Sequence, residues 1–450
     1  MRLSNLLLPD IESALREDPA IVRELFEDLH AEDVADIIEG ADEDLARDML
    51  LALEPDRAAD VFECIEPARQ VRQIDRLGVE LAAPIINEMA SDERADLLAL
   101  LRPIVAEALL ARLDPEEAAD ARKLTAFEDD TVGSVMSTEV LTVDRSMNIG
   151  QVIARVRAGA EEAETIHYVY VVTGKDRLVG VVSLRELILA PNDDIVGDLM
   201  REDIKTIGPR ADQEEAAQII GHYDLIALPV VDDGGMLLGV VTVDDVVDVL
   251  AEEATEDMHR MAAVEPLEAS YFGTDFWTFV KKRSPWLVVL FIGELFTGDA
   301  IKLFDNVVQY QEGLLVLFLP LIVSSGGNSG SQSATIIIRA LAVKEVSLSH
   351  ARRVFTREVS MGIALGLLLS TIGFARAYFW DGTEANVALV VGITLITVVT
   401  LGTVVGAMMP ILLERAGLDP AVSSTPFIAS LVDVLGIVAY FSIAGWILIS

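Results

Sequence analysis

The sequence contains one cysteine, Cys64, and five histidines in 450 residues. A single cysteine excludes an intrachain disulfide and fits a reducing compartment. Basic residues are also scarce, because 34 Lys and Arg stand against 73 Asp and Glu and leave a net charge of −39. This balance is poorly suited to nucleic acid and well suited to cations. A catalytic triad, a P-loop and a Cys/His metal set are lacking too, so we predict no enzymatic activity.

No long apolar segment occurs before Pro285, and no signal peptide is apparent at the amino terminus. We therefore expect the first 284 residues to lie in the cytoplasm. Residues 276–450 hold 11 acidic and 11 basic side chains, so the whole net charge lies in the first 275 residues. An acidic surface kept for solubility or for high salt explains part of this charge. Binding of cations that screen the charge is the other explanation.

Residues 1–127 are predicted to be helical throughout, since apolar residues recur at spacings of three and four. An Ala-Asp pair followed by apolar residues recurs four times, at Ala35-Asp36, Ala59-Asp60, Ala95-Asp96 and Ala119-Asp120. The intervals of 24, 36 and 24 residues predict helical hairpins stacked as a superhelical array. The acidic outer faces of these helices are typical of solvated surface.

Residues 128–253 change to alternating strands and helices, and the pattern occurs twice. The run TVGSVMSTEV returns as IVGDLMREDI, which pairs Met136 with Met200, and further along Gly180 pairs with Gly239. We expect the two copies to pack their small sheets together, because neither buries enough surface alone. This stretch resembles a tandem pair of cystathionine-β-synthase (CBS) domains.

The CBS resemblance implies a nucleotide site. In that family the run G-h-h-S/T-x-x-D ends in an Asp that holds a nucleotide ribose. The second copy keeps the pattern with Thr242 and Asp245, whereas the first copy has Ser183 and Glu186. Together with Tyr170, these side chains are the candidate ligands of ATP. The other role that the resemblance implies is regulatory dimerisation.

Residues 254–275 are predicted to form a connecting helix. A cluster of acids spans the junction with the second CBS copy: Glu252, Glu253, Glu256 and Asp257. Like charges four residues apart on one helix face oppose helix formation. A positive partner is therefore expected at this point. The neighbouring His259 and Arg260 are the simplest source of that charge.

Five apolar segments are long enough to cross a membrane: 285–307, 313–342, 354–378, 387–413 and 421–449. Basic residues precede the first segment and lie between the second and third. By the positive-inside rule, the amino terminus is cytoplasmic and the carboxyl terminus lies outside. Glu294 and Asp299, near the outer end of the first segment, either attract cations or are simple loop acids.

Asp433 is an ionisable residue near the middle of the last segment. A lone carboxylate inside a membrane is costly unless it faces water or a partner, so Asp433 is a candidate ion site. Two polar interruptions support a pore, one at 324–333, built of Gly, Ser, Asn and Gln, and one at 423–426. The alternatives are an Asp that caps a broken helix or bonds to a neighbour, and small residues that only allow close helix contact.

The run GGNSGSQSATIIIRALA, the five spans, Asp433, the CBS pair and the acidic helical array together resemble the MgtE family of Mg²⁺ channels over essentially the whole chain. The resemblance implies a multidomain fold: an all-α superhelical domain, an α+β CBS pair and an all-α membrane domain of five helices (276–450). It implies a homodimer in the cell membrane with a pore on the two-fold axis, where two copies of Asp433 bind hydrated Mg²⁺. The implied pore lining is Gly326, Gly327, Asn328, Gln332 and Thr425, the last standing where the family often has Asn.

The same resemblance implies regulatory Mg²⁺ sites on cytoplasmic acids, which are Asp60, Asp92, Asp96, Asp212, Glu214, Asp224, Asp245, Asp248, Glu253, Glu256, Asp257 and Asp419. Mg²⁺ bound between facing carboxylates would close the pore, and unscreened repulsion at low Mg²⁺ would open it. Two rival functions remain at this stage. One is a transporter that uses Asp433 to couple Mg²⁺ to protons or Na⁺, and the other is a nucleotide sensor that the membrane part only anchors.

Overall fold

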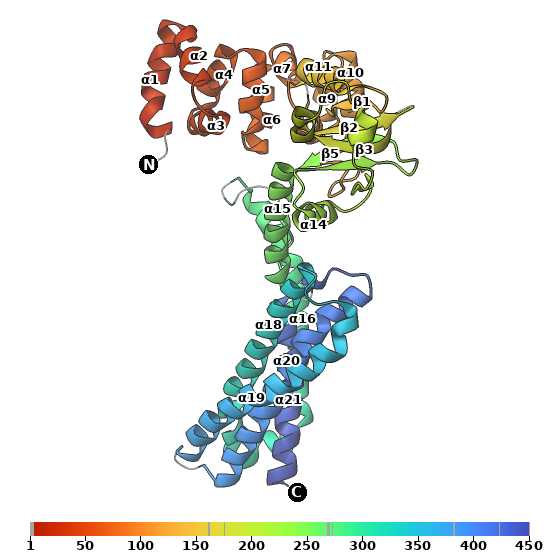
Figure 1. The fold of residues 1–450 in the computed structure, drawn as a ribbon. Coiled ribbons are helices and arrows are strands. Elements are labelled where there is room, and N and C mark those ends of the chain that lie inside the picture. The colour runs from red at the N-terminus through yellow and green to blue at the C-terminus, as the bar shows by residue number, and fades with distance from the viewer. Residues whose placement is uncertain are drawn as a thin grey trace. The chain divides into compact units, whose positions relative to one another are not determined.

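The computed structural model describes residues 4–160, 163–174, 176–267, 271, 273–380, 383–422 and 424–449 (Figure 1). The chain divides into two compact units, which we call the N-terminal unit (Met1–Glu252) and the C-terminal unit (Glu253–Ser450).

The N-terminal unit begins with an array of ten short helices. They are α1 (Ser4–Glu17), α2 (Pro19–Glu27), α3 (Ala31–Gly40), α4 (Glu43–Ala52), α5 (Pro55–Glu63), α6 (Pro67–Leu77), α7 (Val79–Asn87), α8 (Ser91–Leu100), α9 (Pro103–Leu110) and α10 (Pro115–Leu124). Each helix from α1 to α8 packs against the helix two places further along. This repeated contact confirms the predicted superhelical array.

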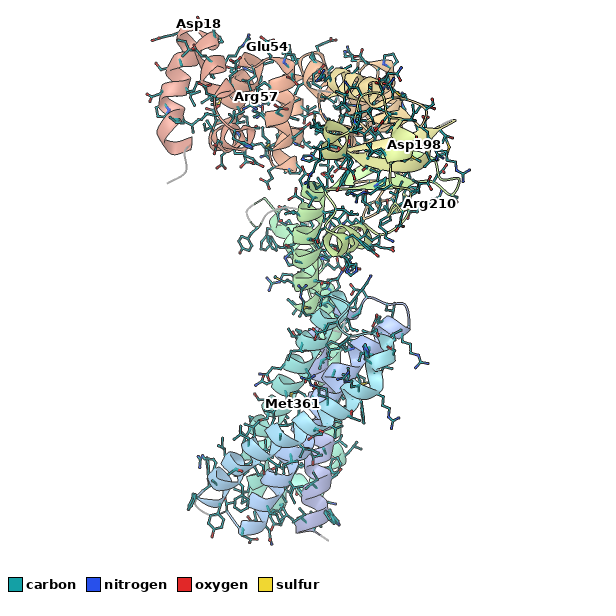
Figure 2. The ribbon with its side chains drawn as sticks, viewed as in Figure 1. Asp18, Glu54, Arg57, Asp198, Arg210 and Met361 are labelled. Atoms are coloured by element: carbon teal, nitrogen blue, oxygen red, sulfur yellow. The ribbon has the colours of Figure 1, made fainter. Side chains whose placement is uncertain are left out.

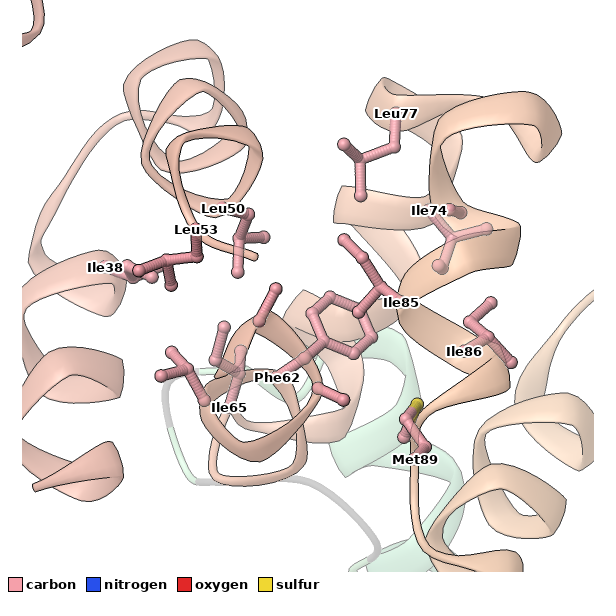
Figure 3. Close-up of a cluster of buried hydrophobic side chains, with 14 of the residues drawn as sticks. Ile38, Leu50, Leu53, Phe62, Ile65, Ile74, Leu77, Ile85, Ile86 and Met89 are labelled. Atoms are coloured by element: carbon pink, nitrogen blue, oxygen red, sulfur yellow. The ribbon is translucent and has the colours of Figure 1, made fainter. Parts of the chain in front are cut away.

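Proline and buried apolar residues explain why the array folds in this way. Five of these helices begin with Pro, whose fixed φ suits the first helical position and whose missing N–H costs nothing there. One continuous core then runs between the helices, and Figure 3 shows its central part, where Phe62 lies among Ile85, Leu50 and their neighbours. Of the four repeated alanines, Ala35, Ala59 and Ala95 are buried, but Ala118 is buried in place of Ala119.

Arginine side chains join successive hairpins of the array. The Arg57 guanidinium on α5 donates to the carbonyl oxygens of Phe26 and Leu29, near the end of α2, and Figure 2 labels Arg57 beside Glu54. One hairpin further on, Arg69 donates to the carbonyl oxygens of Glu39 and Ala41 at 2.9 and 2.7 Å. Because these carbonyls lie at helix ends, each arginine satisfies groups that the helix itself leaves unpaired.

The rest of the N-terminal unit holds two small sheets. In the first, β1 (Thr142–Asp144) pairs in parallel with β2 (Tyr168–Thr173), and β2 pairs antiparallel with β3 (Arg177–Ser183). In the second, β4 (Ala227–Val231) pairs antiparallel with β5 (Leu237–Thr242), and Ile207 forms a parallel bridge to Val230. Helices flank the sheets: α11 (Ile149–Gly159), α12 (Leu184–Leu189), α13 (Val196–Leu199), α14 (Gln213–Tyr223) and α15 (Val243–Met261).

The two CBS copies pack closely against each other. A Cβ on Gly180 would lie 2.3 Å from the Met200 sulfur, and a Cβ on Gly239 would lie 2.4 Å from the Ser137 carbonyl oxygen and 3.3 Å from Met136. No side chain fits at either distance, so each copy needs its glycine where the other copy's loop crosses. The prediction that the copies pack together is confirmed.

The C-terminal unit is built from long helices: α16 (Phe276–Leu303), α18 (Leu319–Ala342), α19 (Ala351–Tyr378), α20 (Ala385–Arg415) and α21 (Thr425–Leu448). Short elements join them, namely α17 (Asp305–Val308), η1 (Tyr310–Phe318), η2 (Leu348–His350) and η3 (Pro420–Val422). Within the described residues, the helices ending at Ala342, Tyr378, Arg415 and Leu448 are long and apolar enough to cross a membrane. The first predicted span is the 28-residue helix α16, which carries Glu294, Asp299 and Lys302. The predicted fold class, helical array, CBS pair and helical membrane part, is confirmed.

Two expectations about local structure are wrong. The backbone is not broken at 324–333, because α18 is a continuous helix through this stretch. Its glycines instead allow contact with α20, since a Cβ on Gly326 would lie 2.4 Å from Val398 and a Cβ on Gly406 would lie 2.1 Å from the Gly330 carbonyl oxygen. The second interruption is the start of α21, where the Ser424 hydroxyl caps the helix. Residue 423 lies outside the described residues.

The connecting helix also differs from the prediction for 254–275. Helix α15 continues from the second CBS copy without a break and ends at Met261. Asp275 lies directly before α16 and caps it, with its carboxylate accepting from the Trp277 N–H at 2.9 Å. Residues 268–270 and 272 of this stretch lie outside the described residues.

Candidate functional site

Asp433 lies against the glycines of α18. A Cβ on Gly327 would lie 3.2 Å from the Asp433 Oδ1 atom, and a Cβ on Gly326 would lie 3.0 Å from Val432. Helix α21 therefore approaches α18 over glycine, where no α18 side chain separates the Asp433 carboxylate from the helix. The Asp433 side chain is half-buried, so part of it remains open on this side of the unit.

A polar stripe follows the exposed face of α18 beside Asp433. Ser324, Asn328 and Gln332 are four residues apart and so lie on one helix face, and all three are exposed. The Asn328 amide donates to the Ser324 hydroxyl at 3.3 Å. We call these three residues the polar stripe. In a bundle whose other exposed residues are largely apolar, this stripe requires water or polar partners.

Thr425 begins α21 and is held from two sides. Its carbonyl oxygen accepts from the Ser331 hydroxyl of α18 at 3.3 Å, and its own hydroxyl donates to the Met261 carbonyl oxygen at 3.1 Å. Met261 is the last residue of α15 and packs with Ile428 and Val432 of α21. The structure thus brings the end of the connecting helix onto the start of the helix that carries Asp433.

Arg260 provides the positive charge expected beside the acids of α15. Its guanidinium pairs with Glu256 one turn earlier and with Asp419 in the loop before α21. Glu253 and Asp257 are half-buried on the same helix. The structure therefore brings two predicted regulatory acids, Glu256 and Asp419, onto one cation of the chain itself.

A second group of acids gathers in the N-terminal unit. We call it the acid cluster, and its members are Glu63, Asp92, Glu93, Asp96, Glu139, Glu164, Asp245 and Glu252. Asp92 is only 8% exposed, and its Oδ1 atom has no hydrogen-bond partner among the described residues. Three predicted regulatory residues, Asp92, Asp96 and Asp245, are thus near neighbours in this cluster.

Burial and mutual repulsion raise the pKa values of the cluster. Burial is the larger cause throughout, and it raises the pKa of Glu63 and of Glu139 to about 7, and that of Glu93 to about 8. The pKa of Asp92 is raised well above its ordinary value by burial and by the nearby Asp245. These carboxyls therefore hold protons near neutral pH unless a cation replaces them.

The remaining predicted regulatory acids lie on the surface of the N-terminal unit. Asp60 pairs with Arg57 at 3.3 Å, and Asp212 caps α14 by accepting from the Glu214 N–H at 2.8 Å. Asp224 ends α14 in the left-handed conformation. Asp248 is exposed on α15, near enough to Glu93 to raise its pKa. Asp212, as a helix cap, and Asp224, as the residue that ends α14, therefore have local structural roles.

The raised pKa values give a pH dependence of stability. A carboxyl whose folded-state pKa lies above its ordinary value binds its proton more tightly in the folded state, so the folded state loses stability as pH rises. For Glu63 and Glu139 this stability is lost between pH 4.5, the ordinary pKa of a glutamate, and about pH 7, the raised pKa. We expect thermal unfolding of the N-terminal unit at a temperature several degrees lower at about pH 7.5 than at about pH 5.5. The double variant Glu63→Gln with Glu139→Gln should show a smaller difference in unfolding temperature between the two pH values. An equal difference in the variant and the wild type would contradict the assignment.

A cavity of about 750 Å³ opens between the two CBS copies, and both copies line it. Its walls combine aromatic rings and cations: Tyr168, Tyr170, Tyr223, Arg185, Arg201 and Lys205. Burial raises the pKa of the Tyr170 hydroxyl, which has no hydrogen-bond partner within the described part of the chain. Rings that stack on a base and cations that bind phosphates are what a nucleotide needs.

Only some of the predicted nucleotide ligands reach this cavity. Tyr170, Ser183 and Glu186 line it, and Glu186 pairs with Arg201 at 2.7 Å. Thr242 and Asp245 of the second copy are absent from its walls. The Asp245 carboxylate instead accepts from the Thr242 N–H and hydroxyl at 3.0 and 2.7 Å, as Glu186 does from Ser183 at 2.9 and 2.7 Å. Asp245 thus belongs to the acid cluster.

Comparison with known proteins agrees with this architecture. Residues 319–443 match the MgtE family, described as divalent cation transporters, residues 29–130 match the MgtE intracellular N domain, and residues 132–193 and 196–252 match CBS domains. The chain is 37% identical to the magnesium transporter MgtE of Thermus thermophilus over 446 residues, 98% of each chain. The chain belongs to the MgtE family. It is also 31% identical to the MgtE of Bacillus subtilis, covering 94% of this chain and 93% of the relative.

Two solved structures resemble the N-terminal part of this MgtE-family chain. One is the soluble part of a magnesium transporter, with 33% identity, a TM-score of 0.53 and coverage of 56% of this chain and 99% of that one. The other is the cytosolic domain of the Mg²⁺ channel MgtE in complex with ATP, with 35% identity, a TM-score of 0.51 and coverage of 53% and 98%. The relatives and the apolar helices identify a multi-pass membrane protein.

Four acid-cluster residues of this MgtE-family chain were not predicted from the sequence: Glu63, Glu93, Glu139 and Glu164. Glu63, at the end of α5, accepts from the N–H of Ala90, just before α8, at 2.7 Å. No local sequence pattern predicts this contact. Within the described ranges, no three Asp, Glu, His or Cys side chains converge closely enough to form a ready-made metal site. A cation at the cluster would have to bind through its own water shell or draw the carboxylates closer.

Proposed function

We propose that this chain is a Mg²⁺ channel of the cell membrane that works as a homodimer. The observation that carries the proposal is the polar stripe of α18 beside Asp433, on the exposed side of an otherwise apolar bundle. A second copy facing this stripe would enclose a polar path with one Asp433 from each subunit. The termini would lie as the positive-inside rule predicts, with the amino terminus in the cytoplasm.

The chemistry of the stripe suits a hydrated ion. Mg²⁺ releases its water reluctantly and is bound through one or two carboxylates, with waters completing its shell. Asp433 would supply the carboxylate, and the amide oxygens of Asn328 and Gln332 would accept hydrogen bonds from the water shell. Thr425, at the start of α21, would shape the cytoplasmic entrance, where its carbonyl and hydroxyl bond to Ser331 and Met261. Other divalent cations of similar hydration would compete.

We further propose that cytoplasmic Mg²⁺ closes the channel. Repulsion within the acid cluster and among the acids of α15 disfavours compact arrangements, and a divalent cation between carboxylates would replace repulsion with bridging. Support comes from Thr425, whose hydroxyl contacts the end of α15, because any movement of α15 then bears on α21. The working parts would be residues 1–127, 128–253, 254–275 and 276–450.

ATP is the proposed ligand of the cavity lined by Tyr170. We expect Arg201→Ala to weaken ATP binding roughly tenfold, because it removes a charge-assisted bond to phosphate and leaves Glu186 unneutralised. Isothermal titration of the purified chain with ATP measures the effect. Asp245→Asn is the matched control, since Asp245 lies outside the cavity and its replacement should leave ATP affinity unchanged. The reverse pattern would move the site to the second copy.

Ion flux into liposomes tests the function as a whole. Purified protein should carry Mg²⁺ down its gradient, and internal Mg²⁺ should suppress the flux. Single-channel currents should appear in planar bilayers. Flux that requires a proton or Na⁺ gradient, without such currents, would favour the coupled transporter. Complete absence of flux would favour a nucleotide sensor anchored in the membrane.

A further inference from the structure

Glu358 is a buried acid in the membrane bundle that the proposed pore does not use. It lies near the start of α19 and is 7% exposed. Its carboxylate accepts from the Ser333 hydroxyl of α18 at 2.8 Å, and Ser333 is itself 6% exposed. Among the described residues, no Lys, Arg or His pairs with this carboxylate. Burying an ionisable side chain in a membrane bundle is costly, so such a residue is a candidate for a functional role.

The contacts of Glu358 reach three helices. Its backbone carbonyl accepts from the Thr403 hydroxyl of α20 at 3.2 Å. One turn further along α19, a Cβ on Gly362 would lie 2.5 Å from the same hydroxyl oxygen, so α19 lies directly on α20. Glu358 is thus fixed from the α20 side and extends its carboxylate to α18.

Ser333 is the residue next to Gln332 of the polar stripe. Elsewhere α18 meets α20 mainly through glycines, as at Gly330 and Gly402, where a Cβ would lie within 3.2 Å of the facing backbone. Glycine contacts set the distance between helices but supply no directional bond. The Ser333–Glu358 hydrogen bond is directional, and successive residues of a helix differ by about 100° in direction. Together with the longer bonds from Ser329 to the Val399 carbonyl oxygen at 3.4 Å and from Ser331 to the Thr425 carbonyl oxygen at 3.3 Å, it fixes which face of α18 is turned toward α21.

We propose that Glu358 is a positioning residue: through Ser333 it sets the rotation of α18, and so places Asn328 and Gln332 beside Asp433. The proposal rests on the proposed function of the polar stripe. It assigns Glu358 an effect on ion selectivity, because a rotated stripe would meet the ion's water shell with different groups. When the Ser333–Glu358 bond is lost, Mg²⁺ transport falls, and discrimination against Ca²⁺ falls with it.

Liposome flux of the full chain tests the effect on transport. Glu358→Ala and Ser333→Ala should each lower Mg²⁺ flux about tenfold and reduce the ratio of Mg²⁺ to Ca²⁺ flux, since each leaves one buried partner unsatisfied. The double variant should be no worse than either single variant. Glu358→Gln should restore both flux and selectivity, because its amide oxygen accepts the same bond. Ser360→Ala is the matched control, since that exposed hydroxyl bonds only to its own helix.

Thiol labelling reads the rotation of α18 without any transport. In a Cys64→Ala background, Gln332→Cys should react quickly with a hydrophilic reagent, and Ala334→Cys, at a fully buried position, slowly. Adding Glu358→Ala should bring the two rates together, and Glu358→Gln should not. An unchanged labelling pattern, or Glu358→Gln as defective as Glu358→Ala, would overturn the proposal. If Asp433 proved dispensable for flux, the proposed pore would fail while the labelling result still judged Glu358.

Discussion

Replacing Asp433 with Ala is expected to reduce Mg²⁺ flux on the order of 100-fold, because each subunit then loses a charged ligand for the ion's water shell. The carboxylate lies over Gly327, so no α18 side chain can move into its place. Asp433→Asn should also fail, since the amide keeps the shape but not the charge. Uptake of Mg²⁺ into liposomes, measured with an indicator dye, gives the result.

The matched control for Asp433 is an acid of the same unit outside the stripe. Asp305 of α17 accepts from the Gln309 amide at 2.9 Å and is exposed. Asp305→Asn should leave flux within about twofold of the wild type. Size-exclusion chromatography shows whether each variant keeps its oligomeric state. Undiminished flux in a well-folded Asp433→Ala protein would exclude the pore that we propose.

The regular parts of the fold could be predicted because each depends on a repeated local pattern. Apolar spacing and recurrent Ala-Asp pairs indicated the helical array. The paired glycines Gly180 and Gly239 indicated the two CBS copies, and the structure shows each glycine in contact with the other copy. In both cases the signal is periodic and needs no knowledge of distant contacts.

The stretch 324–333 shows where local pattern misleads. This polar run was interpreted as a break in an apolar span, and Gly, Ser and Asn do have lower intrinsic helix propensity than the residues around them. In the bundle, Gly326 and Gly330 gain close contact with α20, and Ser329 donates to the Val399 carbonyl oxygen at 3.4 Å. Tertiary packing outweighs propensity here, and an apolar environment favours a backbone bonded within its own helix.

The four unpredicted glutamates of the acid cluster and Glu358 could not be found from the sequence, for a different reason. Glu63, Glu139 and Glu164 come from three distant parts of the chain, and their raised pKa values follow from burial. Glu358 follows three basic residues and resembles an ordinary charge at a helix start. Only the contact with Ser333 distinguishes it. Burial and long-range pairing are properties of the fold, so no single stretch of sequence contains them.

Neutralising Glu253, Glu256 and Asp257 together, as Gln, Gln and Asn, is expected to leave the channel open at Mg²⁺ concentrations that close the wild type. These acids lie on the last turns of α15, whose end contacts Thr425 of α21. With their charge removed, a divalent cation has little to bridge, and the closed arrangement loses its differential affinity for Mg²⁺. Flux at high internal Mg²⁺ should rise at least roughly tenfold, which corresponds to about 1.4 kcal/mol of lost preference.

Loss of net charge alone could produce the same result, and a matched variant separates the two causes. Asp10, Glu12 and Glu17 are exposed acids of α1, so their neutralisation removes three charges without touching α15. This variant should close normally. The triple variant also keeps the ion pair between Arg260 and Asp419, because Glu256→Gln removes only the other partner of Arg260. The end of α15 therefore keeps one ionic contact. If the α1 variant stays open as the α15 variant does, gating responds to total charge. If both close normally, the regulatory site lies outside α15, and the acid cluster around Asp92 is the next site to neutralise.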